Sequence, residues 1–138
     1  MPKTKLAKSF HFYDGLYNLN THVVAGTADE INAWRKKQKG INIDAITGDT
    51  FGEFQPFFDP KRKHQFTIIT LRLPQTRRNL ILTTVHEALH QTNWLLTTRG
   101  IELVDESDEA YAYYHTWLVD KILSGLIPNW LPKKKKRV

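Results

Sequence analysis

The chain has 138 residues, no cysteine, 20 Lys and Arg against 14 Asp and Glu, and 41% hydrophobic residues. This composition is typical of one folded domain, and the absence of cysteine excludes disulfides and metal sites built on thiolates. No stretch approaches the ~20 apolar residues of a membrane-spanning helix, and no apolar block typical of a secretory signal follows the first lysines. We therefore expect an intracellular, cytoplasmic protein without membrane contact.

The net charge of +6 is concentrated at the C-terminal end of the chain. Lys133–Arg137 carry five positive charges, so the rest of the chain is close to neutral. We therefore expect residues 1–131 to form a single domain and residues 132–138 a basic tail. The tail resembles a monopartite nuclear-import signal, and lysine-rich runs also bind phosphate backbones. Contact with nucleic acid or nucleoprotein through Lys133–Arg137 is one interpretation, and a solvated chain end is the other.

Two strands and a short helix are predicted in the first third of the chain. Apolar residues on both sides of Asp14-Gly15 are typical of a hairpin, so we expect strands within residues 10–26. Thr27 and Glu30 form a capping-box pattern, which predicts a helix over roughly residues 28–38.

The middle of the chain predicts a loop-rich segment followed by a strand. Glycines and prolines interrupt residues 41–64, so we expect loops there, and four phenylalanines indicate that the segment packs onto the body or onto a partner. The β-branched run Phe66–Leu73 ends at Pro74 and predicts the strongest strand, with at least one buried face.

A long helix is predicted to follow this strand. It runs from about Leu80 to Thr98, with Asn79 as the candidate N-cap and Gly100 as the stop. Apolar residues at helical spacings of three, four and seven predict its core face, and they are Leu82, Val85, Leu89 and Leu96.

A second long helix completes the predicted elements. It begins near Asp105 or Ser107, has acidic residues in its first turn that favour a helix start, and ends after Ser124 at Gly125. The whole pattern predicts an α+β fold with a short, mostly antiparallel sheet, one connecting helix and two packed C-terminal helices.

The first long helix contains the pattern H-E-x-x-H at His86-Glu87-Ala88-Leu89-His90. Two histidines four residues apart lie on one helix face, with Cβ atoms about 5–6 Å apart. Both imidazoles can therefore bind one Zn²⁺ at about 2.0–2.1 Å, while Glu87 can take a proton from a water molecule. The alternative is a solvated helix face that happens to carry two histidines and a glutamate.

A zinc site usually needs a third protein ligand, and the acidic segment 105–109 is the richest source. Two helices joined by a short connection tend to be antiparallel neighbours, so the start of the second helix could run back toward His90. Glu109 is the first choice and Asp105, on the same face, is the second, whereas His115 points away from Glu109. Stabilisation of the helix start is the alternative role of Glu109.

Two further residues near the motif are candidates for supporting roles. Tyr113 shares the expected ligand face with Glu109 and could donate a hydrogen bond to a transition state, although a packed aromatic is the alternative. Asn93 lies one turn past His90 and could orient a ligand, or it could be a surface amide.

The segment from Val85 to Lys121, including Glu109-Ala110-Tyr111-Ala112-Tyr113, resembles the gluzincin kind of zincin metallopeptidase. It is also similar to small phage-encoded H-E-x-x-H proteins, which would place the chain in a host cytoplasm or a virion. The resemblance implies a minimal zincin-like fold with a strand beside the motif helix. It also implies that His86, His90 and Glu109 bind zinc, and that Glu87 is the general base of a peptidase acting on a peptide or protein.

The motif and the basic tail lead to two hypotheses about function, which belong to different classes. The leading hypothesis is a zinc-dependent hydrolase in which Zn²⁺ polarises a water molecule and a scissile carbonyl, while Glu87 transfers the proton to the leaving amine. The alternative is a non-catalytic structural or interaction protein on a zincin-like scaffold, such as a virion or nucleoprotein component, with a basic tail that contacts nucleic acid.

Overall fold

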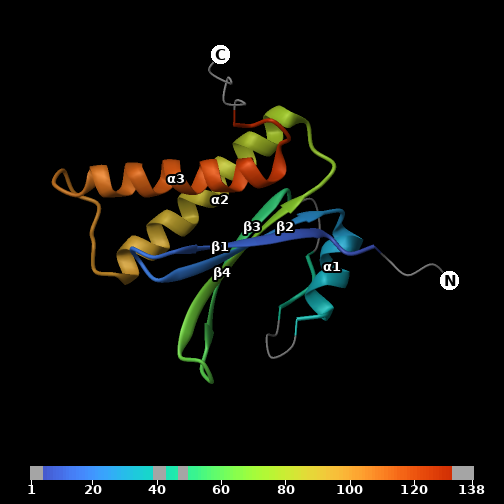
Figure 1. Ribbon diagram of the computed structural model, residues 1–138, viewed down its shortest axis with the longest axis horizontal. Coiled ribbons are helices and arrows are strands. Elements are labelled where there is room, and N and C mark those ends of the chain that lie inside the picture. The colour runs from blue at the N-terminus through green and yellow to red at the C-terminus, as the bar shows by residue number, and fades with distance from the viewer. Residues whose placement is uncertain (1–4, 39–42, 47–49, 132–138) are drawn as a thin grey trace, which may run out of the picture.

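The computed structural model describes residues 5–38, 43–46 and 50–131, and within them the chain forms four strands and three helices (Figure 1). In chain order the elements are β1 (Lys8–Asp14), β2 (Leu19–Gly26), α1 (Ala28–Lys36), β3 (Gly52–Asp59), β4 (His64–Arg72), α2 (Arg77–Thr98) and α3 (Asp108–Leu126). The expected α+β class is confirmed. In this described part of the chain, no helix has both the length and the apolar composition needed to cross a membrane.

The four strands form one mixed sheet in the order β1-β2-β4-β3. Both outer pairings are antiparallel, β1 with β2 and β3 with β4, because short turns join those strands. The central pairing of β2 with β4 is parallel, since α1 and β3 lie between these two strands in the chain. Phe66 to Leu71 of β4 are all buried, which confirms the strongest predicted strand.

Strand β3 corrects the expectation of loops over residues 41–64. Residues 52–59 pair along β4, although Pro56 lies in the middle of the segment. The strand tolerates this proline because β3 is at the edge of the sheet, where a missing N–H on the outer side removes no ladder bond. Part of the expected loop, residues 41–42 and 47–49, lies outside the described residues.

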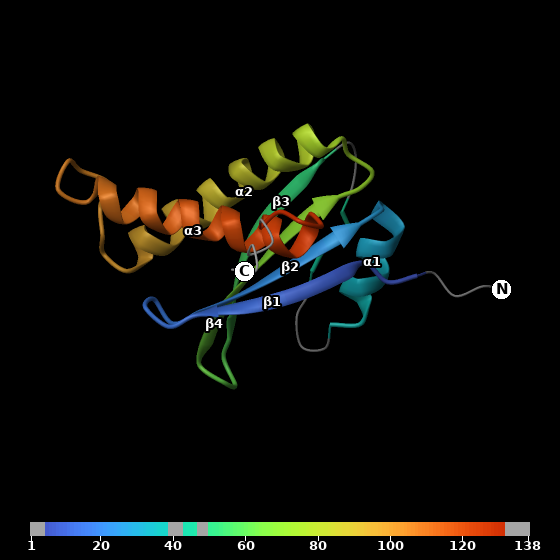
Figure 2. The same cartoon turned by 45° about the horizontal axis from the view of Figure 1, so that its top comes forward.

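The helices cover the two faces of the sheet unequally (Figures 1 and 2). One face packs α2 and α3 around a core that includes Leu19, Val23, Ile69, Leu71, Ala88, Leu95, Tyr114, Leu118 and Ile122. The other face packs the short helix α1 through Ile31 and Trp34 against Val24 and Ile68. The predicted capping box of α1 is confirmed, because the Thr27 and Glu30 side chains each accept the other residue's backbone N–H.

Helix α2 differs from its prediction at the start and on its buried face. It begins at Arg77, three residues early, and its N-cap is Thr76, whose hydroxyl accepts the N–H of Asn79. Its end at Gly100 is confirmed by the left-handed φ of 78° at that glycine. Three of the four residues of the predicted apolar stripe, Leu82, Val85 and Leu89, are exposed.

Helix α3 begins at Asp108, after Ser107, and continues past the expected stop at Gly125. Gly125 lies inside the helix, and the Phe10 ring of β1 occupies the space that a side chain at this position would need. A Cβ at this position would overlap the Phe10 ring. This glycine therefore serves packing between α3 and the sheet, and not helix termination.

Three histidines gather on the face of the sheet that carries α1. His22 on β2 lies directly opposite His11 on β1, with ring centroids 5.5 Å apart, and His64 follows on β4. Burial lowers the pKa of His22 below its usual 6.5, and the charges of His11 and His64 lower it further. The folded state therefore binds a proton at His22 less readily than the unfolded chain does.

We predict that the free energy of unfolding decreases as the pH falls below about 6.5, where His22 of the unfolded chain takes up its proton first. Urea denaturation between about pH 8 and about pH 5 measures this slope. His22→Gln should remove much of the slope, while His64→Gln, which removes the weakest of the three causes, should change it little. An unchanged slope in His22→Gln would contradict the assignment.

Candidate metal site on helix α2

The two histidines of the motif converge on the solvent side of α2. Nε2 of His86 lies 3.1 Å from Nε2 of His90, and both side chains are exposed. Two nitrogen ligands held tetrahedrally by one zinc at 2.0–2.1 Å would be about 3.4 Å apart. The pair therefore already has nearly the separation that a shared zinc ion requires, and the same separation also suits a hydrogen bond between the two rings.

Glu87 lies between the histidines in sequence but on the buried side of α2. The residue is 6% exposed and packs against the start of β3 at Gly52. Burial raises the pKa of the Glu87 carboxyl, while the charges of His86 and His90 act in the opposite direction. The Glu87 carboxyl therefore holds a proton more readily than an exposed glutamate does.

Gly52 allows β3 to pack closely against α2 beside Glu87. A Cβ on this glycine would lie 2.6 Å from Cγ2 of Thr83, 2.9 Å from Cγ of Glu87 and 3.1 Å from its Oε1. Any larger residue would push α2 away from β3 or displace Glu87. No sequence signal indicated this role, because Gly52 was one of several glycines in a segment expected to be a loop.

The candidates for a third ligand lie on α3 and the loop before it, and they are exposed. Glu109 is in the first turn of α3 and Asp105 precedes the helix. The two helices cross and diverge toward the start of α3 (Figures 1 and 2). Within the described residues, no three His, Asp or Glu side chains form a group that could hold a metal ion. The structure thus brings the His86 and His90 side chains together, buries Glu87 on the side of α2 that faces β3, and leaves Glu109 and Asp105 apart from the histidine pair.

Two other residues of α3 take positions that the sequence did not indicate. His115 places Nε2 3.1 Å from the carbonyl oxygen of Val85, next to the motif, although its spacing from Glu109 suggested no role there. Tyr113 is 74% exposed and lines a cavity with Asp14 and Tyr17, to which neither motif histidine contributes. The predicted role of Tyr113 as a hydrogen-bond donor in a reaction stays a prediction.

A shallow hollow of about 340 Å³ lies beside His90. Phe54 of β3 and Trp94 of α2 supply its apolar surface, with ring centroids 5.9 Å apart. Asn93, which the sequence offered as an orienting residue, lines the same hollow with Thr97 and Thr98. An apolar side chain of a bound molecule could rest here while its backbone lies next to the histidine pair.

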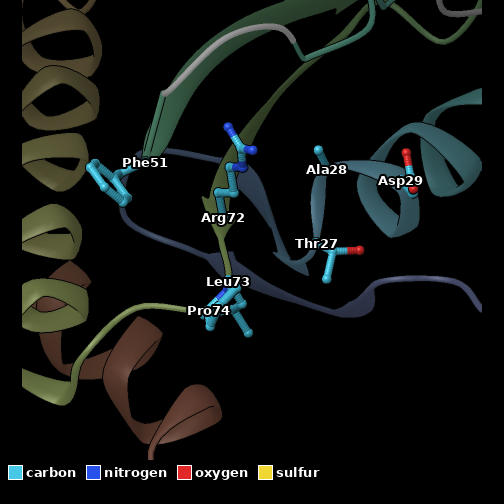
Figure 3. A pocket seen from close by; sticks show the side chains of 7 residues that line it. All are labelled: Thr27, Ala28, Asp29, Phe51, Arg72, Leu73 and Pro74. Carbon is cyan, nitrogen blue, oxygen red and sulfur yellow. The ribbon is translucent and has the colours of Figure 1, made fainter.

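A larger cavity of about 590 Å³ lies away from the histidines (Figure 3). The start of α1, from Thr27 to Asp29, forms one side of it, and Phe51, Arg72, Leu73 and Pro74 form the other. None of the motif residues lines this cavity. The largest cavity described here and the histidine motif are therefore separate features of the molecule.

A buried polar network fixes the orientation of α2 beneath the histidines. Gln91 is fully buried, accepts the hydroxyl of Thr67 at 2.7 Å and donates to Thr21 at 2.8 Å and to the hydroxyl of Tyr114 at 3.0 Å. The network therefore joins α2 to two strands and to α3. It explains why the buried face of α2 is partly polar, contrary to the predicted apolar stripe.

No protein-family model, curated protein or solved structure matches this chain. The resemblance to zincin metallopeptidases therefore stays a prediction that rests on the motif residues. The basic tail, Lys133–Arg137, lies outside the described residues, so its predicted contact with nucleic acid stays a prediction as well.

Replacing Gln91 by Leu should lower the free energy of unfolding by about 2–3 kcal/mol, because the side chain keeps its approximate size while Thr21, Thr67 and Tyr114 lose a buried partner. Urea denaturation of the two proteins measures the difference. Asn93→Leu, an exposed position on the same helix, is the matched control and should change stability by less than about 0.5 kcal/mol. Equal effects at the two positions would argue against the network.

Proposed function

We propose that the protein is a zinc-dependent hydrolase, and specifically a peptidase of the zincin type. The observation that carries this proposal is the convergence of the His86 and His90 Nε2 atoms at 3.1 Å, with a buried carboxylate from the residue between them. A zinc ion bound there would supply a Lewis acid for a water molecule and a carbonyl group. The pair of imidazole nitrogens is a donor set that suits zinc.

The chain's own residues have separate tasks in this proposal. His86 and His90 bind the metal through their Nε2 atoms. Glu87 accepts a proton from the attacking water on its carboxylate and returns it to the leaving amine, a role that its raised pKa favours. Phe54 and Trp94 offer an apolar surface for one side chain of the substrate. A peptide or protein is therefore the substrate class that we infer.

Glu109 remains the proposed third ligand, with Asp105 as the alternative. Either carboxylate must approach the histidine pair when metal binds, because neither belongs to a group of three ligands among the residues described. The exposed positions of both residues leave them available for this movement. For Glu109 this approach would involve the first turn of α3, and for Asp105 the loop before it.

A non-catalytic interaction protein on the same scaffold is the second candidate. The observation that favours it is the exposed position of Glu109 and its separation from the histidine pair. Two histidines that form a hydrogen bond with each other need no metal ion to hold their rings together. Elemental analysis of the purified protein bears on this choice: absence of zinc favours the interaction protein, whereas stoichiometric zinc fits the hydrolase and also an interaction protein that the metal stabilises.

Glu87→Gln should lower peptide hydrolysis by at least about a hundredfold and leave the bound zinc unchanged, because the amide cannot accept the proton. Cleavage of a mixed peptide library followed by mass spectrometry measures activity without a known substrate, and elemental analysis measures zinc. His86→Ala should instead lose the zinc. Glu106→Gln replaces an exposed acidic residue as the control, and it should change neither hydrolysis nor bound zinc. Hydrolysis that survives Glu87→Gln would overturn the proposed mechanism.

Removing the third ligand should weaken zinc binding by about tenfold or more, since three protein ligands normally hold a hydrolytic zinc. We expect this loss in Glu109→Gln and little change in Asp105→Asn or Glu102→Gln. Competition with a chelating dye measures the affinity, and X-ray absorption counts the ligands. A loss confined to Asp105→Asn would move the assignment to that residue, and no loss in any variant would remove α3 from the site.

A further inference from the structure

A third cavity lies between the β1–β2 turn and the first half of α3, apart from the histidine pair. Its volume is about 380 Å³, and its lining is mostly aromatic. The residues that line it are Asp14, Leu16, Tyr17, Ala110, Tyr113, Tyr114 and Trp117. None of His86, Glu87, His90, Asp105 and Glu109 lines it.

Aromatic rings form most of the cavity wall. Tyr17 meets Tyr114 edge to face at 5.7 Å, and Trp117 lies 5.7 Å from Tyr114, while Tyr113 is 74% exposed. The faces of such rings carry negative electrostatic potential and attract cations. The ammonium group of Lys121 already lies 6.0 Å from the centre of the Trp117 ring.

Asp14 is the charged residue of this lining, and only one of its two carboxylate oxygens accepts hydrogen bonds from the described residues. Its Oδ1 accepts the backbone N–H of Leu16 at 2.8 Å and that of Tyr17 at 3.4 Å. Its Oδ2 is buried and has no hydrogen-bond partner among the residues that the structure describes. A carboxylate oxygen withdrawn from water without a donor is unfavourable, and a positive charge placed nearby would offset that penalty.

Acidic residues lie on the chain segment that leads to this cavity. The loop and first turn that lead to Ala110 contain five exposed acidic residues, none of which forms an ion pair among the residues described, namely Glu102, Asp105, Glu106, Asp108 and Glu109. The nearby Arg99 donates to the carbonyl oxygen of Tyr17 and to Gln65, so its guanidinium is held by neutral oxygens and not by Asp14. The region therefore attracts cations beyond the cavity itself.

We infer that this cavity binds the side chain of a lysine presented by a basic peptide segment. The ammonium group lies among the rings of Tyr17, Tyr113 and Trp117 and offsets the charge of Asp14. The apolar stem of the lysine packs on the same rings, and neighbouring basic residues face the acidic loop before α3. An organic cation fits this combination of aromatic wall and unpaired carboxylate, whereas an anion or a neutral apolar group leaves the carboxylate uncompensated.

The test is a calorimetric titration of the full chain with acetyl-tetralysine amide in low-salt buffer. We expect Asp14→Asn and Tyr113→Ala each to weaken binding by about tenfold. Both variants should fold, because Asp14→Asn keeps an Oδ1 acceptor for the turn and Tyr113 is largely exposed. Asp29→Asn on α1 and Phe58→Ala on β3 remove a matching charge and a matching exposed ring elsewhere, and they should bind as the unaltered protein does.

The same peptide with its lysines acetylated at Nζ should bind at least about tenfold more weakly, because it keeps the length of the side chains and loses their charge. Equal losses in the cavity variants and in their controls would overturn the inference, since they would indicate attraction by net charge alone. Absence of binding to the unaltered protein, or equal binding of the acetylated peptide, would overturn it as well.

Discussion

A glutamine in the core determines how helix α2 lies on the sheet. Gln91 can satisfy both its carbonyl and its amide group only when it faces Thr21, Thr67 and Tyr114 together. Unpaired polar groups in a core are strongly unfavourable, so rotation of the helix away from this arrangement would be resisted. Because successive residues of a helix turn by about 100°, the position of Gln91 fixes the directions of His86, Glu87 and His90 as well.

That rotation separates the motif into two environments. His86 and His90 lie toward solvent, where a metal ion can reach them, and Glu87 is buried against β3, where its pKa is raised. The edge strand contributes to this division through Gly52, which allows the close approach of α2. A motif of five residues thus obtains its different chemical properties from a single helix orientation and one glycine on a neighbouring strand.

The sequence predicted those parts of the fold whose signals are local. The capping box at Thr27, the hairpin at Asp14 and the strand through Ile68 and Ile69 each depend on neighbouring residues, and each is present. The apolar stripe of α2 was wrong because burial there is decided by a polar network with partners more than twenty residues away. Strand β3 was missed for a related reason, since only its edge position makes Pro56 acceptable.

The candidate sites show the same difference between features that follow from neighbouring residues and features that depend on distant contacts. The distance between Nε2 of His86 and of His90 follows from spacing within one helix and could be anticipated, whereas the position of Glu109 depends on how α3 crosses α2. The acidic segment before α3 lies where both proposals meet. The proposed zinc site would require one of its carboxylates at bonding distance, whereas the proposed lysine site would require only the summed charge of the segment. Neutralising a single acidic residue would therefore affect the two proposed functions differently, because only the zinc site depends on the position of one carboxylate.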